Sequence, residues 1–164
     1  MDTEFIEKNT LAIRKELDEV LTKNLNMKTV FNNLGIVIIV DPEHEVGGSF
    51  CDNDGAVEIT LSRNYDGQDP HDKFILAKEL GHFFLHWDID SSRTKSSDTL
   101  DAEAVVFASN FLMPRDLYRE SLDAHTGDGF GVEVDKVALD FNVTVKAAIN
   151  RGINLGYISW LRED

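Results

Sequence analysis

The sequence has few of the features of a secreted, disulfide-stabilised or membrane-spanning protein. Cys51 is the single cysteine among 164 residues, so no disulfide can form within the chain. Apolar runs are short, and none approaches the roughly 18 residues that a membrane-spanning helix needs. The first residues are acidic and lack the basic start of a secretory signal peptide. These absences predict a protein of the reducing cytoplasm with no membrane partner.

Positive charge is also scarce. The chain has 16 lysine and arginine residues against 30 aspartate and glutamate residues, and its formal net charge is −14. Because proteins bind the phosphate backbone of nucleic acids through clusters of basic residues, this balance argues against direct nucleic-acid binding. It fits an acidic, solvated surface, and it would steer the protein towards a basic partner.

The strongest pattern in the chain runs from Asp69 to His86, and we name this stretch the motif helix. Asp69 can cap a helix, and Pro70 suits the first helical position. Apolar residues then recur at helical spacing, which indicates a deeply packed helix. Four ionisable residues are set into it, namely Lys78, Glu79, His82 and His86. Ionisable groups on a buried helix need a partner, a hydrogen bond or a metal ion.

Part of the motif helix differs at one position from the zinc-peptidase motif His-Glu-x-x-His. The sequence here is Lys78-Glu79-Leu80-Gly81-His82. In that motif the two histidines bind zinc, and the glutamate acts as general base. Glu79 and His82 therefore match the base and the second ligand. Lys78 replaces the first ligand, and a protonated ammonium has no lone pair to offer a metal.

A small sheet is predicted before the motif helix. Residues 36–40 form a β-branched run typical of a buried strand, and residues 49–61 read as a hairpin with its turn at 53–55. We expect a small, mainly antiparallel sheet packed on the motif helix, and hence an α+β fold. In that sheet Cys51 would be a small buried residue rather than a nucleophile. An edge strand of such a sheet can hold an extended peptide by main-chain hydrogen bonds.

Residues 100–112 predict a second buried helix, which ends before Pro114. At about 100° per residue, its apolar side chains fill an arc of about 160°. Asp101 falls inside this arc and Glu103 falls outside it. We therefore expect Asp101 to point at the core and the site, and Glu103 to be more exposed.

The C-terminal part has the spacing of a helix-turn-helix. Two short apolar patterns are joined at Asn142, which suits a left-handed turn, and Thr144 can cap the second helix. Basic residues are few there, so packing or partner binding is predicted rather than DNA recognition. The domain prediction is a main domain over residues 1–125 and a helix-turn-helix-like subdomain over residues 126–164, packed on it.

Together these stretches resemble the ImmA/IrrE family of bacterial and phage regulatory metallopeptidases. The matching segments are Phe74–His86, Ala104, Phe107-Ala108, Leu112-Met113-Pro114, Phe141–Thr144 and Leu155–Ile158. The resemblance implies a zincin-like fold, zinc as cofactor, and action on or with helix-turn-helix repressors. It implies zinc ligation by His82 and Asp101, the latter where the family has Glu, and a general-base role for Glu79. Lys78 departs from the first ligand, and Val105 departs from the usual Asn or Asp.

Three arrangements of the site remain open. In the first, the Lys78 ammonium lies between Glu79 and Asp101 and balances these carboxylates in place of a metal. In the second, a desolvated and neutral Lys78 ligates the metal. In the third, His82 and His86 bind the metal with Glu79 or Asp101, which leaves Glu79 poorly placed as a base. Outside the third arrangement, His86 is a core histidine or a support for the ligands.

Two functions follow from these arrangements. The first is a regulatory protein of a bacterial or phage mobile element that needs no cofactor. It would be a metal-free or catalytically weakened pseudo-peptidase that binds a helix-turn-helix repressor, or another basic protein, as an antirepressor. The alternative is an active zinc endopeptidase that cleaves such a repressor.

Overall fold

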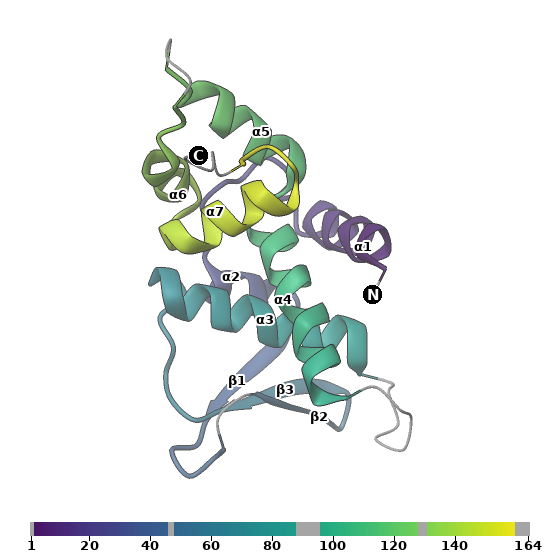
Figure 1. Cartoon of the computed structure of the whole chain (residues 1–164). Helices are drawn as coiled ribbons and strands as arrows, with labels where there is room; N and C mark the ends of the chain where they lie inside the picture. Colours follow the sequence, from purple (N-terminus) through teal and green to yellow (C-terminus); the bar gives the residue numbers. More distant parts are fainter. Residues whose placement is uncertain (1, 46–47, 88–95, 128–130, 160–164) are drawn as a thin grey trace.

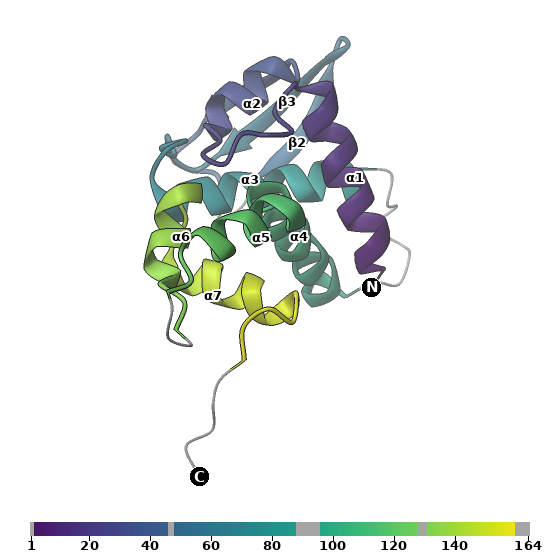
Figure 2. The ribbon, with the colours of Figure 1, turned by 90° about the horizontal axis from the view of Figure 1, so that it is seen from above.

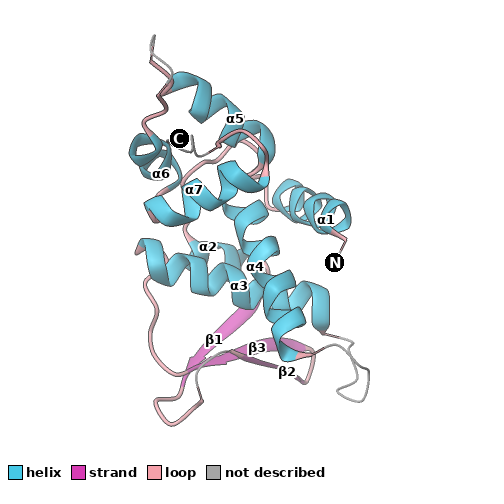
Figure 3. Cartoon of the chain, in the orientation of Figure 1, coloured by secondary structure: helices cyan, strands magenta, loops and turns pink. Residues whose placement is uncertain are grey.

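The computed structural model describes residues 2–45, 48–87, 96–127 and 131–159, and these residues have an α+β fold, as predicted. The elements are α1 (Thr3–Glu16), α2 (Met27–Asn33), β1 (Ile36–Val40), β2 (Ser49–Asn53), β3 (Ala56–Leu61), α3 (Pro70–His86), α4 (Ser97–Leu112), α5 (Arg115–Ala124), α6 (Val134–Phe141) and α7 (Val145–Asn154). The strands lie at one end of the molecule and α5, α6 and α7 at the other, with α3 and α4 between them (Figures 1 and 3).

The sheet is mixed, with β3 in the middle of the strand order β1–β3–β2. β2 and β3 form the predicted antiparallel hairpin. β1 runs parallel to β3, with Ile36 opposite Val57 and Val40 opposite Leu61. The prediction of a mainly antiparallel sheet is therefore wrong for the β1–β3 pair. The chain reverses direction twice between these strands, so β1 is parallel to the second strand of the hairpin, which is the strand that pairs with it.

Cys51 is exposed on β2, so the prediction that it is buried is wrong. Its Sγ lies 3.9 Å from Glu58 Oε2 on the neighbouring strand. Side chains alternate between the two faces of a strand, and Phe50 takes the face that packs against the core. Cys51 therefore points to the other face.

The motif helix is α3, and it packs along α4 at the centre of the molecule. The Asp69 side chain accepts hydrogen bonds from the backbone N–H groups of His71 and Asp72, which confirms the predicted cap. Gly81 lets the two helices approach closely, because a Cβ at this position would lie 3.0 Å from Phe107 Cβ. Within the described chain, no helix combines the length and the apolar character needed to cross a membrane.

The N-terminal helix α1 lies beside α4 (Figure 2) and is tied to it by Arg14. This side chain is fully buried, and its Nη1 donates to the Phe111 carbonyl oxygen at 2.8 Å. Its Nη2 donates to the carbonyl oxygens of Glu19 and Thr22, in the loop that follows α1. The Arg14 guanidinium thereby supplies hydrogen bonds to backbone carbonyl oxygens that are not bonded within a helix or strand.

Lys73 of α3 makes a similar connection. Its ammonium is fully buried and donates to Asn24 Oδ1 at 2.9 Å and to the Phe141 carbonyl oxygen at 2.7 Å. Phe141 is the last residue of α6, so Lys73 also meets the negative end of that helix dipole. Burial and the nearby Arg14 charge lower the Lys73 pKa to about 8.

The predicted turn between the last two helices is present. Asn142 follows α6 in the left-handed conformation, with φ 50° and ψ 57°, and the Thr144 side chain accepts from the Ala147 backbone N–H as the cap of α7. Helix α5, which the sequence analysis did not predict, packs against α6. Tyr118 of α5 donates its hydroxyl hydrogen to the Ala148 carbonyl oxygen at 2.7 Å, which ties α5 to α7.

Candidate active-site cleft between helices α3 and α4

A cleft of about 580 Å³ lies where α3, the start of α4 and β2 meet. The motif helix lines it over successive turns, because positions 78, 82 and 86 lie four apart and share one face. The lining residues are Gly48, Phe50, Lys78, Glu79, His82, Phe83, His86, Trp87 and Asp101. All five residues that the sequence analysis selected therefore lie in one cleft.

Lys78, Asp101 and His82 form a hydrogen-bonded group at the rim of this cleft. Lys78 Nζ lies 3.3 Å from Asp101 Oδ1, and His82 Nε2 lies 3.1 Å from the same oxygen. Burial by itself would raise the Asp101 pKa, but the hydrogen bonds and charges of Lys78 and His82 outweigh it and lower that pKa. Burial lowers the pKa of His82 and so favours its neutral form. The carboxylate is thus ionised and shared between an ammonium and an imidazole.

The hydrogen bonds continue inward from His82 to His86 and Glu103. His82 Nδ1 lies 3.1 Å from His86 Nδ1, and His86 Nε2 lies 3.1 Å from Glu103 Oε2. With Asp101, the two imidazoles make three such contacts, and each contact needs a proton between its atoms. The tautomers of His82 and His86 therefore decide which atom donates in each contact.

The predicted exposures of the two acids on α4 are wrong. Asp101 faces the site as expected, but 58% of its side chain is exposed, whereas the Glu103 side chain is 9% exposed. The helical wheel assigned the buried face from apolar residues alone. At this end of α4 the neighbour is His86 of α3, which is itself buried and gives Glu103 a hydrogen-bond partner. A carboxylate can be buried when it is paired in this way.

Glu79 lies deeper in the cleft and is 3% exposed. Burial raises its pKa, although a hydrogen bond from the Gly48 backbone N–H and the charge of Lys78 act in the opposite direction. Gly48 approaches so closely that a Cβ there would lie 2.8 Å from Glu79 Oε2. Lys78 thus forms an ion pair with Asp101, and its charge lowers the Glu79 pKa. Gly48 is a positioning residue that the sequence analysis missed, since nothing local marks it as the partner of a distant helix.

Aromatic residues form one wall of the cleft, and the sequence analysis also missed this feature. The ring centroids of Phe50 and Phe83 lie 5.0 Å apart, and those of Phe83 and Trp87 lie 5.1 Å apart. Phe50 comes from the edge strand β2, whereas Phe83 and Trp87 come from the end of α3 and the residue after it. Trp87 is 43% exposed, so the wall is open to a partner.

The residues of the cleft do not fit a zinc ion held by three protein ligands. Lys78 offers an ammonium at the first-ligand position, and His82 Nε2 and Asp101 Oδ1 hydrogen-bond to each other. Among the residues that the structure describes, no three histidine, cysteine or acidic side chains are grouped so that they could hold a metal ion. His82 and His86 contact each other through Nδ1, as a hydrogen-bonded pair.

The sequence profile of the IrrE N-terminal-like domain, of peptidase family M78, matches residues 31–151. The chain belongs to this family. The resemblance to the ImmA/IrrE proteins is thereby confirmed. A separate search of curated protein sequences found no match to the chain. In this IrrE-like protein the matched region extends from α2 to Arg151 of α7, so it contains both helices that build the cleft.

Proposed function

We propose that this IrrE-like protein is a regulatory pseudo-peptidase of a bacterial or phage mobile element that binds a helix-turn-helix repressor without cutting it. The observation that carries this proposal is the ion pair between Lys78 and Asp101, with 3.3 Å between Nζ and Oδ1. By the resemblance to the family motif, these residues correspond to the first and third zinc ligands. An ammonium there balances the carboxylate charge that a dication would otherwise neutralise.

The cleft offers three kinds of contact to an extended segment of a protein partner. β2 is an edge strand of the described sheet, so its outer backbone groups can pair with another strand. The aromatic wall of Phe50, Phe83 and Trp87 suits an apolar anchor residue. Lys78 and Asp101 at the rim suit the polar groups of a peptide. The net charge of −14 favours a basic partner, such as a DNA-binding repressor.

The alternative function is an active zinc endopeptidase that cleaves such a repressor. The observation that favours it is Glu79, a buried carboxylate of raised pKa in a peptide-sized cleft. A general base works best when its pKa is near the operating pH, and burial moves Glu79 in that direction. His82 would be the remaining histidine ligand, and Asp101 the carboxylate ligand.

Zinc content separates the two functions. We expect the wild-type protein, purified without chelators, to contain no stoichiometric zinc and to cleave none of a panel of candidate repressors. Lys78→His restores a lone-pair donor and removes the ammonium charge, so it should gain zinc, and a further His82→Ala change should abolish that gain. Stoichiometric zinc in the wild type, lost on His82→Ala, would instead support the endopeptidase.

Repressor binding is tested with purified helix-turn-helix repressors and with duplex DNA. We expect binding to a repressor that Trp87→Ala or Phe50→Ala weakens, and no salt-sensitive binding to DNA. Leu139→Ala is the matched control, because Leu139 is exposed on α6, away from the cleft. Repressor binding that all three variants leave unchanged would rule out the cleft as the interface.

A further inference from the structure

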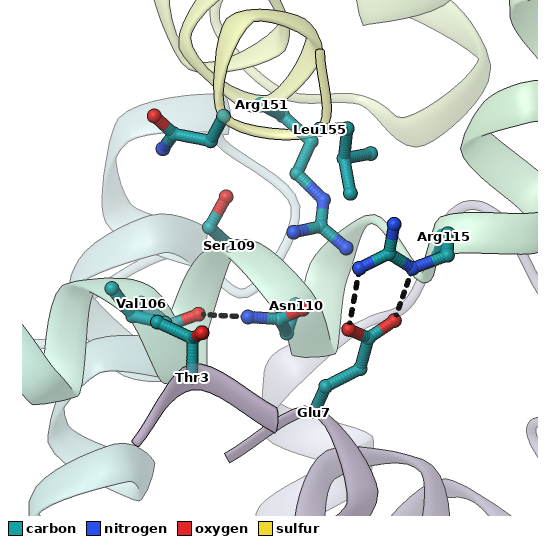
Figure 4. Close-up of a pocket in the computed structure, with 9 residues that line it drawn as sticks. Thr3, Glu7, Val106, Ser109, Asn110, Arg115, Arg151 and Leu155 are labelled. Atoms are coloured by element: carbon teal, nitrogen blue, oxygen red, sulfur yellow. Dashed lines mark hydrogen bonds and ion pairs between the residues drawn. The ribbon is translucent and has the colours of Figure 1, made fainter. Parts of the chain in front are cut away.

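A second cavity, of about 290 Å³, lies where α1, α4, α5 and α7 meet (Figure 4). Asp101 and Glu103 lie near the start of α4, whereas Ser109 and Asn110 of this cavity lie near its end. Ser109 lies eight positions after Asp101 in the helix, which is about 12 Å along the axis. The cavity is therefore separate from the cleft and takes no part in the proposed repressor binding.

Arg151 lines this cavity and carries a buried hydrogen-bond donor without a partner among the described residues. The residue is 4% exposed, and its Nε donates to the Met113 carbonyl oxygen at 2.9 Å, which fixes the guanidinium group. Its Nη2 is buried and has no hydrogen-bond partner among the described residues. Burial lowers the Arg151 pKa to about 10, which still leaves the group charged at neutral pH. A buried charged donor of this kind calls for an acceptor.

A second guanidinium group lies beside it, and one carboxylate faces both (Figure 4). Arg115 binds Glu7 in a bidentate pair, with distances of 2.7 Å from Nε to Oε1 and 2.8 Å from Nη2 to Oε2. Among the described residues that line the cavity, Glu7 is the one acid. One positive charge therefore has no carboxylate partner in the lining, which favours an anion.

Asn110 adds an unused acceptor to the same cavity. It is 5% exposed, and its Nδ2 donates to the Val106 carbonyl oxygen at 2.8 Å. This bond fixes the orientation of the amide, because a flipped amide would bring two oxygens together. Asn110 Oδ1 is then buried without a partner in the described chain. A molecule that satisfies the cavity must therefore supply a hydrogen-bond donor as well as a negative charge.

We propose that this cavity binds a small oxyanion that carries an O–H group, of which protonated phosphate is the simplest. Its charged oxygens would accept from Arg151 Nη2, and its O–H would donate to Asn110 Oδ1. The ligand would bridge α4 and α7, so binding should also stabilise the packing of the C-terminal helices on the rest of the protein.

The test is isothermal titration calorimetry of the full chain with inorganic phosphate and with sulfate, at an ionic strength held near about 0.1 M. Sulfate has the same shape but no O–H at neutral pH. We expect phosphate to bind in the millimolar range or more tightly, and sulfate to bind about tenfold more weakly, the effect of one strong hydrogen bond. Asn110→Leu should remove this preference for phosphate.

Two variants that change the charge of the cavity should shift the affinity for phosphate in opposite directions. Arg151→Gln should weaken phosphate binding about tenfold or more, whereas Glu7→Gln should strengthen it, because it removes a negative charge and frees Arg115. Arg119→Gln is the matched control, since Arg119 is an exposed residue of α5 that pairs with Asp123.

Three results would overturn the proposal. They are no heat of binding with millimolar phosphate, equal affinity for phosphate and sulfate, and equal affinities of the Arg151→Gln and Arg119→Gln proteins. If Arg151→Gln does not fold, Glu7→Gln decides, and unchanged or weaker phosphate binding by that variant counts against the site. Water alone in the cavity predicts the first of these results.

Discussion

His86 and Glu103 form a buried pair, with 3.1 Å between Nε2 and Oε2 and side-chain exposures of 7% and 9%. The pair joins the last turn of α3 to the first turns of α4. Glu103→Ala would leave the buried His86 Nε2 without its carboxylate partner, so we expect it to lower the free energy of unfolding by about 3 kcal/mol. Asp101→Ala should cost less than about 1 kcal/mol, because its pairs are exposed to solvent. Urea denaturation of both variants measures the difference, and an equal or larger loss for Asp101→Ala would contradict this ranking.

The packing of α3 on α4 should be sensitive to side-chain size at Gly81. A Cβ at this position would lie 3.1 Å from the Ala104 carbonyl oxygen, which is backbone and cannot move aside easily. Gly81→Val should therefore lower the free energy of unfolding by about 1–3 kcal/mol, as overpacking does. Gly81→Ala should cost less, because the gain in helix propensity of about 1 kcal/mol offsets part of the strain.

The control for this series is Ala102→Val, at an exposed position of α4. It reports the intrinsic helix cost of valine, which is well under about 1 kcal/mol. Thermal unfolding of the three variants measures these differences in stability. A Gly81→Val protein as stable as Ala102→Val would show that the helices have room at this crossing.

Lys73 should make the free energy of unfolding depend on pH in the alkaline range. Its pKa is about 8 in the folded protein against an ordinary value of 10.5. Between these values the unfolded chain binds more protons than the folded protein, so the Lys73 contribution to the free energy of unfolding increases with pH. We expect the wild type to gain stability relative to Lys73→Met across this window, measured by urea denaturation at several pH values. A difference that is independent of pH would show that the ammonium is not desolvated.

Asp72 should make the free energy of unfolding depend on pH in the acid range. It is buried, accepts hydrogen bonds from both terminal nitrogens of Arg63, and accepts from the Asp66 backbone N–H at 2.8 Å. The bond with Arg63, against the effect of burial, lowers the Asp72 pKa below its ordinary 3.8. Its stabilising contribution is therefore complete above 3.8 and is lost as pH falls from there through the folded pKa.

Asp72→Asn is the comparison for this effect, because it keeps the shape and removes the charge. The difference in unfolding free energy between wild type and Asp72→Asn should be constant near neutral pH and should shrink in acid. If the difference grows as the pH falls, the pairing with Arg63 is not the source of the lowered pKa.

The sequence by itself determined the features that depend on local spacing. Asp69 and Pro70 start the motif helix, Asn142 and Thr144 form the turn between the last helices, and both follow from the preferences of single residues. The repeat at positions 78, 82 and 86 placed these side chains on one face. The family was also readable, because its motifs are themselves stretches of local sequence.

The tertiary structure alone decided which polar groups are buried and which strands are neighbours. Glu103 is buried because His86 meets it from another helix, and β3 lies beside β1 because the hairpin folds back with its second strand inward. The cavity of about 290 Å³ gathers Glu7, Asn110 and Arg151 from three helices that are far apart in the chain. The spacing of apolar residues describes one helix or strand at a time. The burial of a charged side chain depends instead on the partners that other helices and strands place beside it.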